Sequence, residues 1–388
     1  MNKIKHVYIV GSKGIPASYG GFETFVEELT GRKKEKRILY HVGCMNERES
    51  QYTYNGAECF NVHTNIKGPL GKMFQVCDAL KYVCKDAEKY SGEGVIVYIL
   101  GCRIGPFLYY YRKKLKRKIP DIQIMVNPDG MEWRRSKWKG WQKTFLKFCE
   151  RCLVKNADLI IADSMGMQRI IEKEFKVPTE KIKYIAYGAE VVDVSEKSKP
   201  AEEWYQKKGI IPEQYYLIVG RFVPENNYET MISEFMKTKI TKKLVIISNV
   251  EENEFYEELK RNTGFAEDDR ILFVGTVYDK EILSVIRRNA FAYIHGHEVG
   301  GTNPSLLEAL ATTKVNLLLG VDFNREVGAE GAIYFDKAEG NLASIIEKTE
   351  KMTEQERAVL GEKAKQRICN HFSWDFIVEE YEKTFIGE

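Results

Sequence analysis

Short apolar segments alternate with amphipathic, helix-patterned segments along this chain, and this alternation constrains the fold more than any other feature. In the first half, strand candidates lie at residues 6–10, 38–42, 59–62, 95–100, 123–126, 159–162 and 183–186. Helical patterning is clearest at residues 22–29, where apolar side chains recur at the i, i+3, i+4 and i+7 positions of one helix face. Strands that alternate with helices form a mostly parallel sheet covered on both faces. The pattern predicts an α/β, Rossmann-like, doubly wound domain.

The alternation stops between residues 191 and 208 and then starts again. This stretch is polar, charged and without apolar periodicity, and it contains Pro200, so we interpret it as a linker between domains. Further strand candidates follow at residues 216–219, 244–247, 271–274, 291–294, 315–319 and 333–335, and a separate amphipathic helix at 374–385. A chain of 388 residues is long enough for two such cores. We therefore predict two doubly wound domains, residues 1–195 and 196–370, followed by a C-terminal helical segment at 371–388, with a crevice at the carboxyl ends of the strands.

Composition excludes several protein classes. Apolar residues make up 44% and charged residues 30% of the chain, which is typical of a soluble globular protein. No stretch approaches the roughly 20 apolar residues of a membrane-spanning helix, and residues 1–6 lead into a strand candidate, so we expect a cytoplasmic protein. Cys149 and Cys152 are the one Cys-x-x-Cys pair, and no second pair of matching spacing accompanies them. We expect reduced structural thiols on a helix and no metal.

Charge is distributed unevenly along the chain. Residues 1–195 hold 34 Lys and Arg against 22 Asp and Glu, whereas the remainder holds 25 against 34. Aromatic and basic residues are interleaved at Arg112, Lys113, Lys116, Arg117, Trp133, Arg134, Arg135, Trp138 and Trp141. This mixture suits contact with an anionic membrane surface, and a solvated charged face is the plainer alternative. We expect no nucleic acid partner, because no recognised binding motif accompanies the charge and the second half is acidic.

The glycine-rich turn after the strand candidate at 291–294 has the pattern of an anion-binding helix start. Gly300 and Gly301 allow close backbone approach, Asn303 suits the N-cap and Pro304 the first helical position. The backbone amides of Ser305 and Leu306 would then be free to bind an anion. One turn later, Glu308 can accept hydrogen bonds from ligand hydroxyls such as those of a ribose. An ordinary strand-to-helix turn remains the structural alternative.

Other candidate residues follow strands in both domains. Gly20 and Gly21 stand at a helix start after the first strand, where they suit an anion or sugar, or only a tight turn; neither Gly-x-Gly-x-x-Gly nor a P-loop is present. Arg221 follows the first strand of the second domain and can bind phosphate or pair with a surface acid. Asp129 lies in a Pro-Asp-Gly sequence and is either a general base, a sugar-hydroxyl acceptor or a turn residue, and Asp163 carries the same ambiguity.

Four motifs, in order along the chain, resemble those of glycosyltransferase family 4, and more narrowly those of bacterial rhamnosyltransferases of cell-wall and capsular polysaccharide synthesis. They are Gly-Ser-Lys-Gly-Ile-Pro-Ala-Ser-Tyr-Gly-Gly-Phe-Glu-Thr-Phe at 11–25, Asn-Pro-Asp-Gly-Met-Glu-Trp at 127–133, Gly-Arg-Phe-Val-Pro-Glu-Asn-Asn at 220–227 and Gly-Gly-Thr-Asn-Pro-Ser-Leu-Leu-Glu-Ala at 300–309. The resemblance implies a GT-B fold, in which two Rossmann-like domains face a central crevice and the final helix, through Trp374 and Phe376, crosses back to the first domain.

The resemblance also implies roles for individual residues. Arg221 would hold the donor diphosphate, Glu308 a pentose hydroxyl, and Gly20 and Gly21 the region of the diphosphate and transferred sugar. The remaining donor-binding residues would be Asn226, Gly301, Thr302, Asn303, Ser305 and Leu306. Two positions depart from the family pattern: Asn226 replaces a usual lysine, and Gly300 replaces the usual first acid, for which Glu298 lies two residues too early. Backbone amides of residues 301–303 would then contact the sugar.

The implied activity is that of a retaining, metal-independent rhamnosyltransferase. It would move L-rhamnose from dTDP-β-L-rhamnose to glucose or GlcNAc on an undecaprenyl diphosphate lipid, in a β-1,4 linkage, at the cytoplasmic face of the membrane. In a front-face mechanism, Arg221 and the helix start would stabilise the leaving diphosphate, and Asp129 and Asp163 would orient the acceptor. A donor activated by UDP or GDP, and a non-catalytic scaffold that binds nucleotide sugars, are the alternatives.

Overall fold

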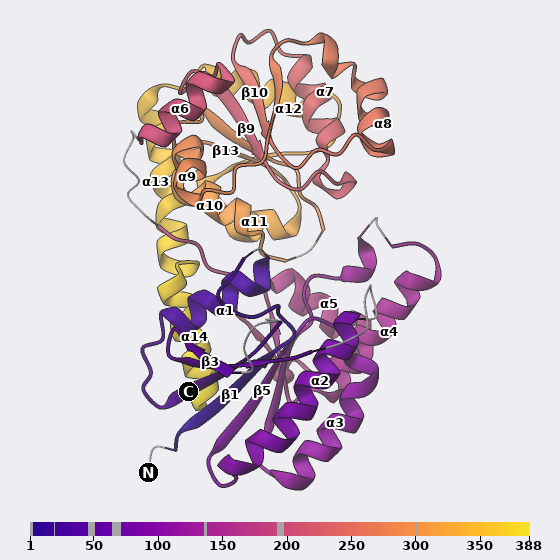
Figure 1. The fold of residues 1–388 in the computed structure, drawn as a ribbon. Coiled ribbons are helices and arrows are strands. Elements are labelled where there is room, and N and C mark those ends of the chain that lie inside the picture. The colour runs from indigo at the N-terminus through magenta and orange to yellow at the C-terminus, as the bar shows by residue number, and fades with distance from the viewer. Residues whose placement is uncertain are drawn as a thin grey trace. The chain divides into compact units, whose positions relative to one another are not determined.

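The computed structural model describes residues 3–18, 20–45, 51–63, 71–135, 138–191, 198–299 and 301–388. The chain forms two compact units (Figure 1). The first contains Met1–Gly188 and Trp374–Glu388, and the second contains Ala189–Ser373. The first unit therefore ends before residue 195, where the sequence places the boundary, and the chain leaves the second unit after residue 373 rather than 370.

The first unit is built on an eight-stranded sheet with β1 near its centre. The strands are β1 (Lys5–Val10), β2 (Ile38–Cys44), β3 (Gln51–Tyr54), β4 (Ala57–Asn61), β5 (Gly94–Leu100), β6 (Gln123–Asn127), β7 (Leu159–Ala162) and β8 (Ile182–Tyr184). Their order is β3-β4-β2-β1-β5-β6-β7-β8, and every pair is parallel except β3 with β4. The sequence does not predict β3. It enters through a hairpin whose turn residues, Asn55 and Gly56, are both left-handed, as a tight two-residue turn requires.

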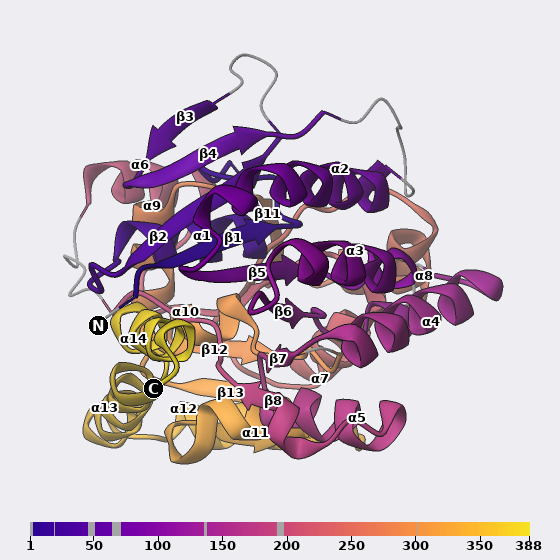
Figure 2. The same ribbon diagram turned by 90° about the horizontal axis from the view of Figure 1, so that it is seen from below.

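Helices cover both faces of this sheet. On one face α2 (Gly71–Asp86), α3 (Gly105–Lys118), α4 (Trp141–Asn156) and α5 (Met165–Phe175) pack side by side in chain order, and α1 (Gly21–Gly31) packs with α14 (Trp374–Ile386) (Figure 2). Helices α3 and α4 approach closely at Gly105, where an added Cβ would lie 1.8 Å from the backbone oxygen of Cys149. Cys149 and Cys152 are free thiols on α4, as the sequence predicts.

Helix α14 brings the end of the chain into the first unit. Its buried face includes Ile377, Val378 and Tyr381, and the hydroxyl of Tyr381 lies 3.0 Å from that of Tyr98 on β5. The carboxylate of Glu382 accepts hydrogen bonds from the backbone amides of Lys34 and Glu35, at 2.8 and 3.1 Å. Apolar packing and a carboxylate that binds main-chain amides together fix this helix.

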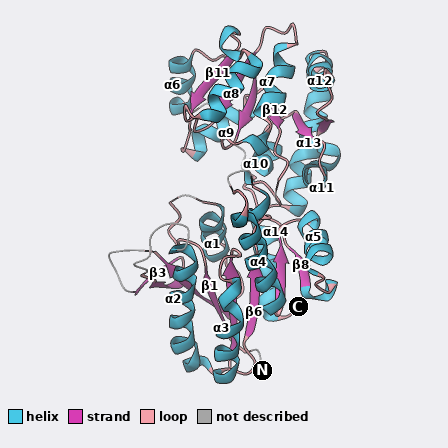
Figure 3. Cartoon of the chain, turned by 90° about the vertical axis from the view of Figure 1, so that its right-hand side faces the viewer, coloured by secondary structure: helices cyan, strands magenta, loops and turns pink. Residues whose placement is uncertain are grey.

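The second unit is built on a six-stranded, all-parallel sheet (Figure 3). Its strands are β9 (Tyr215–Val219), β10 (Lys243–Ile247), β11 (Ile271–Gly275), β12 (Ala292–His295), β13 (Asn316–Leu319) and β14 (Ile333–Phe335), in the order β11-β10-β9-β12-β13-β14. Its helices are α6 (Lys199–Lys208), α7 (Tyr228–Met236), α8 (Glu254–Thr263), α9 (Lys280–Arg288), α10 (Pro304–Thr312), α11 (Asp322–Gly328), α12 (Asn341–Glu350) and α13 (Glu354–His371). Each strand candidate of the sequence overlaps an observed strand, so the prediction of two doubly wound sheets is confirmed.

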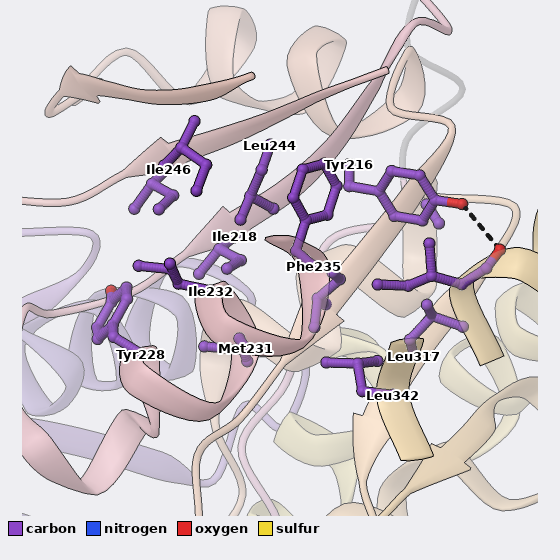
Figure 4. Close-up of a cluster of buried hydrophobic side chains, with 14 of the residues drawn as sticks. Tyr216, Ile218, Tyr228, Met231, Ile232, Phe235, Leu244, Ile246, Leu317 and Leu342 are labelled. Atoms are coloured by element: carbon purple, nitrogen blue, oxygen red, sulfur yellow. Dashed lines mark hydrogen bonds between the residues drawn. The ribbon is translucent and has the colours of Figure 1, made fainter. Parts of the chain in front are cut away.

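Central strand β9 divides its side chains between two apolar clusters. Tyr216 and Ile218 point into the cluster of Figure 4, together with Phe235 of α7, whereas Tyr215 and Leu217 belong to the cluster on the other face. The hydroxyl of Tyr216 reaches the edge of its cluster and donates to the backbone oxygen of Ile346, at 3.4 Å (Figure 4). Because both faces are covered, the strands of this sheet are mostly apolar and show no regular alternation of apolar and polar residues.

The interpretation of residues 191–208 as a linker is wrong for its second part. Residues 199–208 form helix α6, and Pro200 occupies the first turn, where its missing amide hydrogen is not needed. The helix buries only Ala201 and Tyr205, too few apolar positions to give a clear helical period in the sequence. The hydroxyl of Tyr205 lies 2.9 Å from that of Tyr215 on β9 and fixes the helix to the sheet. Residues 192–197 lie outside the described residues.

Candidate functional site

The turn between β12 and α10 has the predicted helix start, but its amides are engaged. Asn303 is the N-cap, with its side-chain oxygen 2.9 Å from the amide of Ser305, and Pro304 is the first helical residue. The amide of Leu306 donates to the backbone oxygen of Asn303 at 3.0 Å. The expectation that these two amides are free is therefore wrong, because the cap residue accepts from both. An anion at this helix start must replace these two internal hydrogen bonds or bind the backbone of residues 301–303. Gly300 lies outside the described residues.

Glu308, the predicted hydroxyl acceptor, forms an ion pair with Arg287 of α9. Its Oε2 lies 2.7 Å from Nη2 of Arg287, whose side chain is 5% exposed, whereas that of Glu308 is 46% exposed. The same guanidinium donates to Oγ of Ser305 at 3.2 Å. Because a carboxylate can accept about four hydrogen bonds, this pair fixes Glu308 without exhausting its acceptor capacity. The sequence does not reveal Arg287, which lies on a different helix.

A polar network behind this turn joins the ends of β9 and β12 to the start of α10. Oγ of Ser305 donates to the backbone oxygen of Val219 at 3.1 Å and lies 3.2 Å from the hydroxyl of Tyr293. That hydroxyl is 3.2 Å from Nδ1 of His295. Burial lowers the pKa of His295 to about 3, so its ring is neutral at physiological pH. The network places the strand end that precedes Arg221 directly beside α10.

Arg221 is exposed, and its side chain makes no hydrogen bond or ion pair with the described residues. Its backbone oxygen accepts from Nδ2 of Asn226, the last residue of the short helix η4 (Pro224–Asn226), at 2.6 Å. Oδ1 of Asn226 lies 2.7 Å from Nδ1 of His297. The sequence does not single out His297; the signal for it is a His-x-His pattern that begins at the last residue of a buried strand.

Hydrogen bonds connect the segment around His297 to the loop that carries Arg221. The backbone oxygen of Gly296 accepts from Nδ2 of Asn227 at 2.7 Å, and that of His297 accepts from Nδ2 of Asn324 at 2.9 Å. A Cβ at Gly296 would lie 2.5 Å from the backbone oxygen of Asn226, so only glycine fits. Glu298 forms an ion pair with Lys337. Residues 220–227 and 296–298 therefore form one connected wall.

In the first unit, the predicted glycine loop leads into α1, which begins at Gly21 as expected. Gly20 has a φ of 130°, and a Cβ there would lie 1.9 Å from Oε2 of Glu23. The buried carboxylate of Glu23 accepts from the backbone amide of Lys13 at 2.7 Å. Glu23 therefore shapes the loop from inside, a role that the sequence does not predict; Tyr19 lies outside the described residues.

The segment after β6 forms the turn that its Pro-Asp-Gly sequence favours, in a strained form. Asp129 and Met131 have φ values of 68° and 34°, in the left-handed region that non-glycine residues rarely adopt. The amide of Asp129 donates to the side chain of Asn127 at 2.9 Å, and its carboxylate lies 3.5 Å from Arg135. Burial raises the pKa of Tyr187, and the charges of Asp129 and Asp163 add to this effect. The two acids that are predicted to orient the acceptor therefore both affect the pKa of the same buried tyrosine.

Part of the predicted membrane face has a different role. The indole nitrogens of Trp133 and Trp138 donate to Glu150 and Glu132, at 2.9 and 3.2 Å, and Arg135 lies near Asp129 and Glu132. These three predicted face residues anchor the segment after β6 to buried carboxylates. On α3, Arg112 and Lys116 both pair with Asp158, which reduces their net charge. The sequence cannot show these pairings, because the acids come from other elements.

The remaining predicted face residues are exposed on or near α3 and α4. They are Lys113, Arg117, Arg134 and Trp141, and Trp141 is 75% exposed. Tyr109 and Tyr110, which open the same basic and aromatic stretch, are exposed as well, and so are Phe145 and Phe148 of α4, which the sequence does not single out. A hollow of about 340 Å³ on α3 is lined by Tyr109, Arg112, Lys113, Lys116 and Arg117.

Among the residues that the structure describes, His, Cys, Asp and Glu side chains form no group of three or more that is arranged to hold a metal ion. Within the same ranges, each helix is too short or too polar to cross a membrane.

Comparison with family models divides the chain as the two units do. Residues 200–367 match the model described as Glycosyl transferases group 1, and residues 4–190 match a domain of unknown function (DUF1972). An uncharacterized glycosyltransferase of Methanocaldococcus jannaschii is 27% identical over 244 residues, which are 61% of this chain and 60% of that protein. The chain thus spans about 60% of the length of that curated relative. The similarity to group 1 glycosyl transferases therefore lies in the second unit.

Solved structures establish the fold. A glycosyltransferase from Rickettsia africae has a TM-score of 0.75 at 14% identity and covers 99% of this chain and 98% of its own. Anabaena HepE, solved in complex with UDP, has a TM-score of 0.71 at 16% identity with complete coverage of both chains. Sucrose-phosphate synthase from Thermosynechococcus elongatus has a TM-score of 0.72 at 14% identity, again with complete coverage. The two parallel-sheet units are those of the GT-B glycosyltransferase fold.

Proposed function

We propose that this protein is a retaining rhamnosyltransferase that binds a nucleotide sugar through its second unit. The observation that carries the proposal is the hydrogen bond from Ser305 to Val219, which brings the loop of Arg221 beside the helix of Glu308. The exposed guanidinium of Arg221 lies on one side of this contact, and the carboxylate of Glu308, which Arg287 holds in place, lies on the other. These groups match the phosphates and the ribose hydroxyls of a nucleoside diphosphate. Arg221 binds the phosphates, and Glu308 accepts from ribose hydroxyls.

The proposed chemistry relies on stabilising the leaving diphosphate. Negative charge grows on the diphosphate as the glycosidic bond to the donor breaks, and Arg221 lowers the energy of that transition state. The diphosphate oxygen takes the proton of the acceptor hydroxyl on the same face of the sugar, so no metal is required. In the first unit, Asp129 and Asp163 orient the acceptor, and Gly20 and Gly21 leave room for the transferred sugar. Solved neighbours of the same fold that bind UDP support a nucleotide ligand of this class.

The identity of the substrates rests on the four sequence motifs. We infer dTDP-β-L-rhamnose as the donor and a glucose or GlcNAc residue on an undecaprenyl diphosphate as the acceptor. Such a lipid acceptor requires access to the cytoplasmic face of the membrane. The exposed aromatic and basic residues of α3 and α4, among them Tyr110, Lys113, Trp141 and Phe148, support binding to an anionic membrane surface.

A donor panel tests the proposal. The purified protein is incubated with dTDP-rhamnose, UDP-glucose, UDP-GlcNAc and GDP-mannose, each with lipid-diphosphate-linked glucose or GlcNAc, in the presence and absence of EDTA. We expect turnover with dTDP-rhamnose that EDTA does not abolish. Turnover only with UDP- or GDP-sugars would contradict the donor assignment.

Two substitutions separate an enzyme from a scaffold. Arg221→Ala and Glu308→Gln should each lower kcat/KM at least about tenfold, since each removes one charged contact worth about 1.5–3 kcal/mol. Thermal melting checks that both variants are folded. Wild-type protein that binds nucleotide sugars but transfers none from the whole panel would support the scaffold alternative.

A further inference from the structure

We propose that Arg287 of α9 is a positioning residue that sets which nucleoside sugar the donor site accepts. By pairing with one oxygen of Glu308, it leaves the carboxylate one free oxygen for one sugar hydroxyl. A 2′-deoxynucleoside diphosphate then binds as tightly as the corresponding ribonucleoside diphosphate. The inference rests on the proposed function, because it requires Glu308 to contact the sugar of a nucleotide, and it gives a reason independent of the motifs for a thymidine-type donor.

Arg287 is attached to both ends of helix α10. Its guanidinium donates to Oγ of Ser305, in the first turn of that helix, at 3.2 Å. Its backbone oxygen accepts from Oγ1 of Thr313, the residue that caps the other end, at 2.9 Å. These two contacts fix the position of the guanidinium relative to Glu308, which lies on the same helix.

The ion pair with Glu308 compensates the burial of a positive charge. The side chain of Arg287 is 5% exposed, and its Nη2 lies 2.7 Å from Oε2 of Glu308. Nε of Arg287 is buried and has no hydrogen-bond partner in the part of the chain that the structure describes, so few acceptors could replace Glu308. Because a buried charge that loses its partner is strongly destabilising, the pair should persist when a nucleotide binds.

The second carboxylate oxygen of Glu308 remains available to a ligand. Oε1 accepts no hydrogen bond from the described residues. The side chain of Glu308 is 46% exposed although its partner is almost fully buried, so its exposed part is turned away from Arg287. A carboxylate that binds a 2′,3′-diol offers one oxygen to each hydroxyl. With Oε2 engaged, Glu308 has one free oxygen, and a 2′-deoxyribose supplies one partner for it, the 3′-hydroxyl.

Calorimetry of the wild-type full chain with two pairs of nucleotides tests this inference. UDP and dUDP differ only in the 2′-hydroxyl, and dTDP and 3′-deoxythymidine diphosphate differ only in the 3′-hydroxyl. The Kd values of the first pair should agree within about twofold. Those of the second pair should differ by at least about fivefold, since a hydrogen bond to a charged group is lost. A loss of affinity without the 2′-hydroxyl that equals or exceeds the loss without the 3′-hydroxyl overturns the inference.

Substitution of Arg287 tests whether this residue sets the selectivity. Arg287→Met frees Oε2 for the second hydroxyl, so the ratio of the Kd of dUDP to that of UDP should rise to about fivefold or more. Arg287→Lys keeps a positive charge beside the carboxylate and should keep the ratio near the wild-type value. Arg261→Met, which removes an exposed arginine from α8 of the same unit, should leave both Kd values unchanged.

The possible outcomes separate this inference from the proposed function. A purely structural role of Arg287 would weaken the binding of UDP and dUDP equally, and an unchanged ratio in folded Arg287→Met therefore overturns the inference. If thermal melting shows that this variant does not fold, the wild-type pairs and Arg287→Lys still decide. Wild-type binding that depends on the 2′-hydroxyl overturns the inference and leaves the nucleotide-sugar site standing. Wild-type protein that binds none of the four nucleotides overturns both.

Discussion

Glu150 is a carboxylic acid enclosed in the first unit, and its protonation affects stability. It is fully buried on α4 and accepts from the indole of Trp133, while burial and then the charge of Asp129 raise its pKa to about 8. The unfolded value is near 4.5, so the folded protein holds this proton more tightly. Its contribution is fully present below pH 4.5 and is lost as the pH rises towards 8. Glu150→Gln should therefore raise the free energy of unfolding by about 1–3 kcal/mol at pH 7.

Urea denaturation at pH 7 and pH 4.5 checks this expectation. Glutamine keeps an oxygen for Trp133 but does not ionise, so the gain should disappear at pH 4.5. Glu180→Gln changes an exposed carboxylate and should alter stability little at either pH. An equal effect of Glu150→Gln at both pH values would show that ionisation of Glu150 is not its cause.

Sequence patterns predict single residues well where the physics is local. The cap at Asn303, the proline at helix position one and the start of α1 at Gly21 follow from backbone rules that span a few residues. Partners from distant elements are not local. Arg287 for Glu308 and His297 for Asn226 become visible only when the fold brings these distant segments together. The predicted site residues were therefore identified without the contacts that set their charge and orientation.

At the scale of elements, the crossing of α3 and α4 depends on Gly105. A Cβ there would meet the backbone oxygen of Cys149 at 1.8 Å and the backbone nitrogen of Leu153 at 2.9 Å. Backbone atoms cannot rotate away as a side chain can, so the helices must separate. Gly105→Ala should lower the free energy of unfolding by about 3 kcal/mol or more, measured by urea denaturation. Gly21→Ala, at a helix start with open space around the added Cβ, should be nearly neutral, and equal stability of the two variants would contradict the argument.

The attachment of α14 is a second property of elements that can be measured. Glu382 binds the amides of Lys34 and Glu35, so Glu382→Ala leaves two partly buried donors without this acceptor. The free energy of unfolding should fall by about 1–3 kcal/mol. Glu379→Ala on the same helix removes only an exposed ion pair with Lys383 and should change it by less than about 1 kcal/mol. If both variants unfold at the same urea concentration, the main-chain contacts of Glu382 contribute nothing measurable.

Strand β3 and helix α6 escape the sequence prediction for physical reasons. Strand β3 is short, lies at the sheet edge and has only exposed and half-buried side chains, so it lacks an apolar run; the Asn55-Gly56 turn was the signal for it. Helix α6 buries few residues and contains a proline, and in the sequence this combination resembles a linker. Strongly buried elements are therefore predictable, whereas those at the edge depend on turn and cap chemistry.

At the scale of the whole molecule, charge separates the two halves of the chain. Residues 1–195 carry a net +12, from 34 basic and 22 acidic residues, whereas the remainder carries −9. The exposed sides of α3 and α4 contain many of these basic residues, and Glu150, the one acid of the two helices, is buried. An anionic membrane surface should attract this part of the first unit over about one Debye length, roughly 10 Å at 0.1 M salt.

Vesicle binding at several salt concentrations separates the charged from the aromatic contribution to this attraction. Wild-type protein should sediment with vesicles of phosphatidylglycerol and phosphatidylcholine, and less so as salt rises from 50 to 500 mM. Lys113→Gln with Arg117→Gln removes two exposed charges, each worth about 1 kcal/mol at the surface, and should flatten the salt dependence. Trp141→Ala with Phe148→Ala should weaken binding at every salt concentration, because burial of apolar surface is not screened. Tyr278→Ala, an equally exposed aromatic of the second unit, should have no effect, and a loss equal to that of the Trp141 and Phe148 variant would place the contact elsewhere.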